Sequence, residues 1–149
     1  MDNENPGYKI QDIKARIKSP EIMRLVSYYK YSPSKASIGS LTDSYISDSD
    51  IFIYGCIIQD KTVGIIVLRR EPTASAEIVG IAVSPENRNL GIGRKMIEYV
   101  IKNCGYHTIT AETDDDAVGF YRKCGFKIED LGYKYQDTKR YKCTLERSI

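Results

Sequence analysis

Apolar residues along the chain change repeatedly between strand-like and helix-like spacing, which predicts mixed α and β structure. Runs rich in β-branched residues predict seven strands: Tyr8–Ile13, Ile51–Gln59, Thr62–Arg69, Ala76–Val83, His107–Thr113, Phe126–Asp130 and Arg140–Leu145. Ser-Pro starts predict helices from Ser19 to about Tyr31 and over Pro33–Ser47. Two further helices are predicted, one opened by Gly91-Ile92-Gly93 and one over Asp115–Lys123, and the polar Tyr133–Lys139 is predicted to be a loop.

The first candidate for chemistry is the turn between the strand Ala76–Val83 and the helix that follows it. The first N–H groups of a helix have no acceptor within the helix, and the helix dipole adds a partial positive charge there. Gly91 and Gly93 lack a Cβ, so an anion can approach the backbone itself, and Arg88 and Arg94 add full charges nearby. The pattern predicts a phosphate site.

Two familiar phosphate motifs do not fit this turn. A dinucleotide fingerprint needs a third glycine where Met96 stands, and a P-loop needs a Gly-Lys-Ser/Thr triplet that the chain lacks. The remaining pattern, Arg88-x-x-Gly91-x-Gly93, resembles the acyl-CoA pyrophosphate loop of the GNAT N-acyltransferase superfamily. A second stretch, DDDAVGFYRKCGF from Asp114 to Phe126, resembles the C-terminal motif of the same family. Its matching positions are Ala117, Phe120, Tyr121, Gly125 and Phe126.

The resemblance implies an α/β (α+β) GNAT fold over residues 1–149 as a single domain, with a mixed central sheet of about six or seven strands and about four helices. It implies acetyl-CoA as cosubstrate, without a metal, and transfer of an acetyl group to a primary amine. The cofactor-binding residues expected from it are Ile81, Ala82, Val83, Arg88, Asn89, Leu90, Gly91, Ile92, Gly93, Arg94, Asp114, Ala117, Phe120 and Tyr121.

The resemblance also points to two catalytic residues. The family counterpart of Tyr121 protonates the sulfur of the leaving CoA; the alternative is that Tyr121 belongs to the apolar face of a short helix. Glu77 stands eleven residues before Arg88, the spacing of the family's strand glutamate that acts as base. Partial desolvation in an apolar strand would raise the pKa of Glu77 toward a useful range. Alternation groups Glu77 with Val79 and Ile81, which leaves open whether it faces the site or solvent.

Two further expectations concern the surroundings of the reacting groups. Backbone N–H groups near Ala82 and Val83 are expected to stabilise the developing oxyanion, because the strand offers no suitable side chain. Asp114 stands where the family usually has Asn, within an acidic run that continues through Asp115 and Asp116. These acids either cap the following helix or attract a cationic amine.

Composition is ordinary for a globular protein, with 42% hydrophobic and 28% charged residues. A net charge of +2 gives no support for binding to nucleic acid or to a membrane. Four widely spaced cysteines and one histidine argue against a zinc site and a disulfide framework. Together with the polar start MDNENPGYK, this predicts a cytoplasmic protein.

The acceptor, the acyl group and the oligomeric state each allow more than one interpretation. The acceptor is a small-molecule or peptide amine that the sequence does not identify. The acyl group could be larger than acetyl. A homodimer is compatible with the resemblance. Tyr28, Tyr29 and Tyr31 either line an acceptor cleft or pack in the interior. The alternative to an enzyme is a non-catalytic acyl-CoA-binding regulatory or interaction module.

Overall fold

The structure is a computed structural model that describes residues 7–135 and 137–147. Its strands are β1 (Lys9–Asp12), β2 (Ile51–Ile58), β3 (Lys61–Glu71), β4 (Ser75–Val83), β5 (Thr108–Thr113), β6 (Lys127–Tyr135) and β7 (Thr138–Glu146). Its helices are α1 (Pro20–Ser27), α2 (Lys35–Ser47), α3 (Ile92–Asn103) and α4 (Val118–Lys123), with single 3-10 turns η1 (Lys14–Arg16) and η2 (Pro85–Asn87). The predicted order of strands and helices is confirmed.

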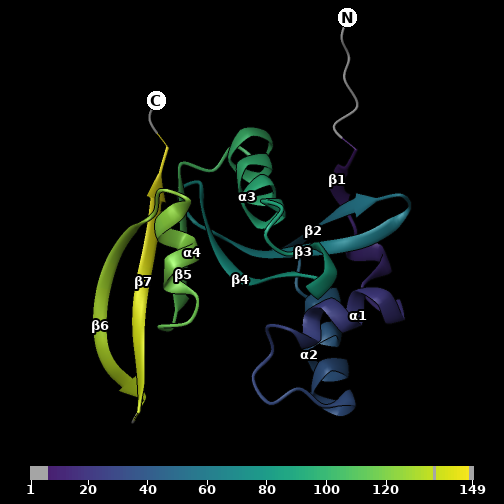
Figure 1. Cartoon of the computed structure of the whole chain (residues 1–149), viewed down its shortest axis with the longest axis horizontal. Coiled ribbons are helices and arrows are strands. Elements are labelled where there is room, and N and C mark those ends of the chain that lie inside the picture. Colours follow the sequence, from purple (N-terminus) through teal and green to yellow (C-terminus); the bar gives the residue numbers. More distant parts are fainter. Residues whose placement is uncertain (1–6, 136, 148–149) are drawn as a thin grey trace, which may run out of the picture.

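All seven strands form one sheet in the order β1-β2-β3-β4-β5-β7-β6 (Figure 1). Neighbouring strands are antiparallel except β4 and β5, which are parallel. This parallel pair is short: Ser75, Ala76 and Glu77 of β4 pair with residues 108–110 of β5, and the two strands then diverge. We call the divergent part, residues 78–83 of β4 and 111–113 of β5, the fork.

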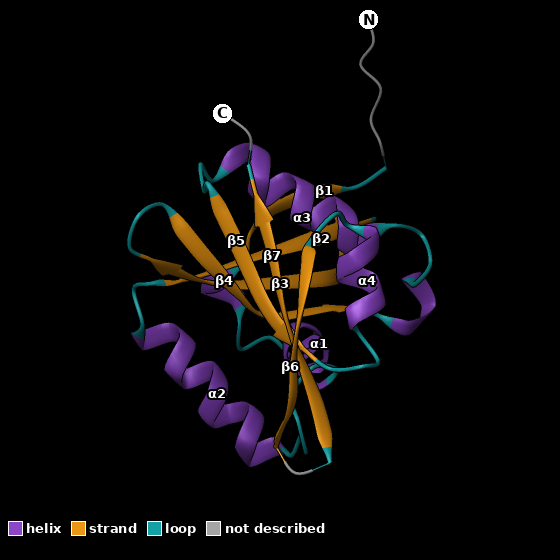
Figure 2. Cartoon of the chain, turned by 90° about the vertical axis from the view of Figure 1, so that its left-hand side faces the viewer, coloured by secondary structure: helices purple, strands orange, loops and turns teal. Residues whose placement is uncertain are grey.

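Helices cover the two faces of the sheet and create two separate cores. On one face, which we call the α3 face, Met96 and Val100 of α3 pack with Tyr121 of α4 against the strands. On the other, the α1 face, Leu25 and Val26 of α1 pack against β2 and β3. From the side shown in Figure 2, β5, β7 and β6 have no helix in front of them, and α2 lies beside them.

A β-bulge in β4 changes which residues face each core. Val67 of β3 pairs with Gly80 and the next residue, Leu68, pairs with Ile78, so Val79 is the additional residue in β4. Val79 and Ala82 therefore pack in the core of the α1 face, whereas Ile81 packs in the core of the α3 face. The prediction that Glu77, Val79 and Ile81 share one face was wrong for Ile81, because simple alternation does not anticipate a bulge.

The helix boundaries differ from the predicted ones at several ends. Helix α1 ends at Ser27, a turn earlier than expected, and α2 starts after Ser34 instead of at Pro33. The reason at α2 is a capping box in which the side chains and backbone N–H groups of Ser34 and Ser37 bond reciprocally. Helix α4 begins only at Val118, because the three residues before it form a turn.

The predicted loop Tyr133–Lys139 was wrong, since strand pairing continues into it from both sides. Strand β6 extends to residue 135 and β7 starts at residue 138, so the two form a long hairpin. Polar side chains are compatible with these strands because residues near the hairpin end are largely exposed. Residue 136 lies outside the described residues.

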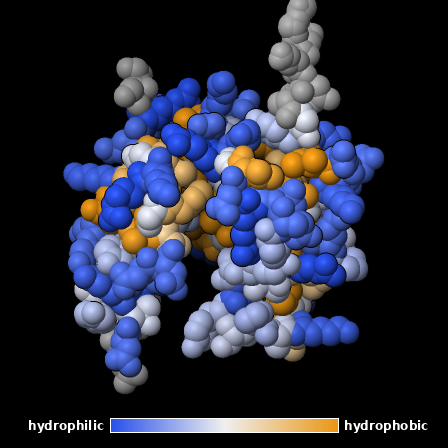
Figure 3. Space-filling view, viewed as in Figure 1, coloured by the Kyte–Doolittle hydropathy of each residue, from blue (hydrophilic) through white to orange (hydrophobic). Residues whose placement is uncertain are grey.

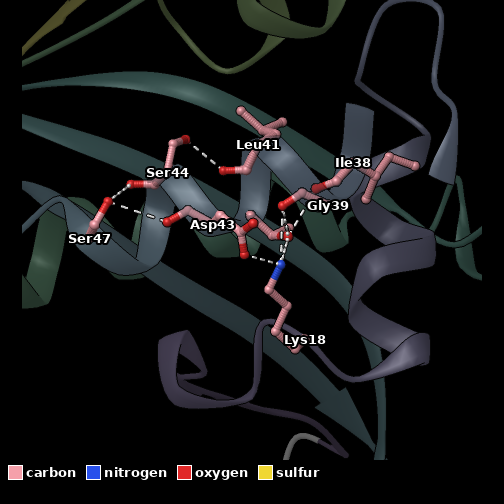
Figure 4. A network of polar contacts seen from close by, with 8 residues as sticks. Lys18, Ile38, Gly39, Leu41, Asp43, Ser44 and Ser47 are labelled. Atoms are coloured by element: carbon pink, nitrogen blue, oxygen red, sulfur yellow. Dashed lines mark hydrogen bonds and ion pairs between the residues drawn. The ribbon is translucent and has the colours of Figure 1, made fainter. Parts of the chain in front are cut away.

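Helix α2 buries Thr42 and Tyr45, packs Ile38 and Leu41 against the core of the α1 face, and is also held by polar contacts. The Lys18 ammonium donates to Thr42 Oγ1 at 2.7 Å and to the Gly39 carbonyl at 3.1 Å, and it pairs with Asp43 at 2.6 Å (Figure 4). These bonds, together with Tyr45 in the core, fix α2 beside the α1 face of the sheet.

Candidate active site

The N-terminus of α3 has the geometry predicted for an anion site. Gly91 is the N-cap residue with a φ of 78°, a left-handed conformation that favours glycine, and no side chain caps the helix. The first helical hydrogen bond runs from Lys95 N–H to the Gly91 carbonyl at 3.0 Å. Among the described residues, the N–H groups of Ile92, Gly93 and Arg94 accordingly have no acceptor, which leaves them for a ligand such as a phosphate.

Gly93 has a second reason to be glycine. A Cβ at this position would lie 2.9 Å from the ring of Phe120, so the missing side chain allows α4 to approach α3. Phe120 and Gly93, which the sequence placed in two separate motifs, are thus in direct contact.

Arg88 and Arg94, which were expected to add positive charge beside the glycine turn, both have partners elsewhere. Arg88 turns back, donating from Nε to the Val83 carbonyl at 3.0 Å, with its guanidinium 5.4 Å from the centre of the Tyr28 ring. Arg94 pairs with Glu98 at 3.5 Å on the exposed side of α3. The cation at the turn itself is Lys95, whose Nζ would lie 3.5 Å from a Cβ on Gly91. Sequence reasoning missed Lys95, although its position one helical turn after Gly91 was a usable signal.

The fork opens directly beside this turn. Beyond Glu77, β4 has no pairing with β5 among the described residues, so one edge of Ile81, Ala82 and Val83 has no strand partner. The opposite edge of these residues still pairs with β3. Apart from the Val83 carbonyl, which accepts from Arg88, backbone N–H and C=O groups on the open edge are therefore available to an extended ligand, as in the addition of a peptide to a strand edge.

Tyr121 projects from α4 into the core of the α3 face and is 5% exposed. Its ring makes edge-to-face contacts with Phe120 and Phe126, at centroid distances of 5.1 and 5.2 Å. Within the described part of the chain its hydroxyl makes no hydrogen bond, and since no buried polar side-chain atom there lacks a partner, this oxygen is accessible at the surface. Burial raises the pKa of Tyr121 well above its ordinary value, so the phenol stays protonated and can act as a donor.

Glu77 lies at the base of the fork, on the α1 face, since its neighbours Ala76 and Ile78 point into the opposite core. Its side chain is 35% exposed, and its carboxylate is 3.8 Å from Arg69. Burial, followed by the nearby Glu71, raises the pKa of Glu77, while Arg69 acts in the opposite direction. The structure thus places Glu77 and Tyr121 on opposite faces of the sheet.

Tyr29 and Tyr45 form a hydroxyl pair on the α1 face, with 2.6 Å between their oxygens. A Cβ on Gly80 would collide with the Tyr29 ring, so this ring lies directly against β4 at the bulge. Of the tyrosines considered from sequence, Tyr29 therefore packs, whereas Tyr31 is 88% exposed.

The expected helix cap is not observed, because α4 has no side-chain cap among the described residues, and Asp114 instead closes the turn before it. Its Oδ1 accepts the N–H groups of Asp116 and Ala117, at 3.0 and 3.2 Å. Asp115 accepts the hydroxyl of Tyr141 at 2.6 Å, which ties the start of α4 to β7. Both carboxylates thus have structural partners.

Comparisons with known proteins show the family of this chain. A sequence model of the acetyltransferase (GNAT) domain matches residues 48–128, so the chain belongs to the GNAT acetyltransferase family. It is 28% identical over 108 residues to the peptidyl-lysine N-acetyltransferase YjaB of Salmonella typhimurium, covering 68% of this chain and 70% of that protein. The chain is an N-acetyltransferase.

Solved structures show the same fold. A GNAT family acetyltransferase from Elizabethkingia anophelis with acetyl-CoA bound matches 96% of this chain and 100% of its own, with a TM-score of 0.74 and 24% identity. A Bacillus subtilis acetyltransferase in complex with CoA matches 95% of this chain and 99% of its own, with a TM-score of 0.72 and 23% identity. The predicted GNAT fold is confirmed.

Among the described residues, no helix is long and apolar enough to span a membrane, and no group of three or more His, Cys, Asp or Glu side chains could hold a metal ion. All four cysteines are unpaired thiols, and Cys56 and Cys143 are buried as small apolar residues in the sheet.

Proposed function

We propose that this chain transfers the acetyl group of acetyl-CoA to a primary amine, and that residues 1–149 act as one catalytic domain. The observation that carries the proposal is the fork opening beside the uncapped N-terminus of α3. An anion-binding turn and an unpaired strand edge next to each other suit a ligand with a pyrophosphate and an extended amide-containing arm.

Binding is assigned to residues of the turn, the fork and α4. The N–H groups of the first turn of α3, from Gly91 to Arg94, would bind the pyrophosphate, and Lys95 would add a full charge. The open edge of Ile81, Ala82 and Val83 would hold the arm, with the remaining predicted contacts coming from Asn89, Leu90, Ala117 and Phe120. Bound acetyl-CoA supplies an activated acetyl thioester.

Glu77 and Tyr121 would handle the two protons of the reaction. Glu77 accepts a proton from the acceptor ammonium, directly or through water, and so frees the lone pair that forms the new C–N bond. Tyr121 donates a proton to the sulfur as the C–S bond breaks. Their position on opposite faces of the sheet supports this division, because the thioester would enter the fork from the α3 face and the amine from the α1 face.

The comparisons support an amine acceptor of the lysine type, because a relative is a peptidyl-lysine N-acetyltransferase. The predicted cytoplasmic location and a homodimer remain compatible with this function. A dodecameric spermidine N-acetyltransferase of Vibrio cholerae is among the proteins that share the fold.

The test is thermal unfolding with acetyl-CoA, with NAD as the control ligand. A ligand at a hundredfold excess over its Kd stabilises a fold by about 2.7 kcal/mol, which raises the Tm of a domain of this size by several degrees. A rise with acetyl-CoA alone is expected, followed by CoA release in the presence of primary amines. No rise with acetyl-CoA would refute the proposed function, and binding without CoA release by any amine would favour a non-catalytic binding module.

A further inference from the structure

The α1 face of the sheet carries charged side chains on the strands that no helix covers. Glu77 pairs in register with Thr110 of β5, and Glu112 follows two residues further along on the same face. Lys134 of β6 and Arg140 of β7 both reach Glu112, at 2.9 and 3.1 Å. We call the surface formed by Glu77, Thr110, Glu112, Lys134 and Arg140 the open face. Figure 2 looks onto its strands β5, β7 and β6, and Figure 3 shows the molecule hollowed between the β6–β7 hairpin and the part formed by α1 and α2.

The two ends of the open face differ in charge. At the Glu77 end a second carboxylate, Glu71, is close enough to raise the pKa of Glu77, and Arg69 is the neighbouring cation. At the other end the cations Lys134 and Arg140 converge on the single carboxylate of Glu112. The hydrogen bond from Lys134, followed by that from Arg140 and by the charges of both, holds the pKa of Glu112 below the ordinary value. A carboxylate end and a cationic end on one surface would be complementary to a molecule with an ammonium group and a carboxylate.

Arg140 uses only one of its guanidinium nitrogens in a hydrogen bond to a described residue. It donates to Glu112 through Nε, and among the described residues its two terminal guanidinium nitrogens have no acceptor. These two nitrogens can bind a planar carboxylate in a bidentate manner. The Arg140 side chain is 22% exposed, so such a contact would be partly shielded from water.

Strand geometry gives the separation of the two ends. Glu112 is one strand away from Glu77 and two residues further along, on the part of β5 that diverges from β4. With at least about 4.8 Å between strands and about 3.3 Å per residue, the two Cα atoms are therefore about 8 Å apart or more. An extended chain advances about 1.2 Å per bond, so at least about six bonds are needed to span this distance. The ammonium and the carboxylate of a matching ligand are therefore separated by a chain of at least that length, which excludes an α-amino acid that has only its α-amino group.

We propose that the acceptor is an ω-amino carboxylic acid, whose terminal amine lies at Glu77 and whose carboxylate is bound by Arg140 and Lys134. This rests on the proposed acetyl transfer and adds the acceptor class to it. A peptide with a lysine side chain has the same amine but a neutral amide in place of the carboxylate, so it makes a weaker contact with the two cations.

The experiment compares three amines of equal chain length at saturating acetyl-CoA: 6-aminohexanoate, 6-aminohexanamide and hexylamine. We expect kcat/KM to be at least tenfold higher for 6-aminohexanoate than for the other two, because a charged hydrogen-bonded contact is worth about one decade or more. Arg140→Gln should remove most of this preference by raising KM for 6-aminohexanoate, with kcat little changed.

The matched control is Arg70→Gln. Arg70 pairs with Asp50 and lies over the Phe52 ring, away from the open face, so the preference should stay as in the wild type. Lys134→Gln provides a second variant if Arg140→Gln fails to fold. With acetyl-CoA binding intact, equal kcat/KM values for the three amines, a preference for the amide, or no turnover of 6-aminohexanoate would each overturn the acceptor class. Loss of the wild-type Tm rise with acetyl-CoA would instead refute the proposed function itself.

Discussion

The hydroxyl pair of Tyr29 and Tyr45 provides a sharp test of how the α1 face is built. Tyr45 is 4% exposed, and its hydroxyl bonds that of Tyr29 at 2.6 Å across the junction of α1 and α2. Tyr29→Phe removes one oxygen and leaves the other hydroxyl without this partner. A buried polar group that loses its partner costs about 1–3 kcal/mol.

The cost converts into a measurable change in Tm. For a domain of this size each kcal/mol lowers the Tm by about 2–4 °C, so Tyr29→Phe should lower it by about 2–12 °C. Burial raises the pKa of both tyrosines, so both stay neutral and the loss should be the same at pH 6 and at pH 9. Tyr31→Phe, at an exposed position, is the control and should leave the Tm unchanged.

A double-mutant cycle isolates the pair. Tyr29→Phe and Tyr45→Phe each leave one unpaired hydroxyl, whereas the double variant leaves none, so the double variant should lose less stability than the sum of the single variants. Calorimetry or urea unfolding of the four proteins measures this. Additive losses, or a Tm for Tyr29→Phe within one degree of the wild type, would refute the reasoning.

Three further predictions concern the site. Tyr121→Phe should lower kcat strongly while the acetyl-CoA-induced rise in Tm is unchanged; equal turnover by the variant would remove the proton-donor role. Gly91→Val should abolish acetyl-CoA binding, measured by calorimetric titration, because a β-branched residue is strained at a φ of 78°; undiminished affinity would contradict the assignment of the turn. The pKa of Glu112 is lowered from its ordinary value of 4.5, so its contribution to stability is present above that pH and is lost as the pH falls through the lowered value. Glu112→Gln should therefore destabilise the protein at pH 7, and the difference from wild type should disappear in acid; a difference that persists at pH 2 would exclude an electrostatic origin.

The parts of the fold that the sequence predicted are those with strong local signals. The strand before Ser84, the glycine turn and the amphipathic α3 were recognisable because apolar periodicity and turn chemistry agree there. The length of the β6–β7 hairpin was underestimated because its outer part has no strong local signal. Its outer residues are polar and exposed, and the pairing that makes them strands is a relation between two segments that neither segment reveals alone.

The candidate site shows the same division. Gly91 could be assigned from its turn, whereas the contact between Gly93 and Phe120 depends on how two helices meet. The bulge at Val79 arises from pairing with β3. The side on which Ile81 lies could therefore not be predicted from the alternation of residues along β4. Arg140 was predicted only as a strand residue, and its approach to Glu112 joins positions that are 28 residues apart.

The contact between Gly93 and Phe120 joins two parts of the chain that the sequence keeps apart. Three residue pairs join β4 to β5, and α3 and α4 also meet at this contact. A larger residue at position 93 would have to displace the Phe120 ring or separate the two helices. A substitution at Gly93 would therefore disturb α4 as well as the glycine turn, although it changes only the turn in the sequence.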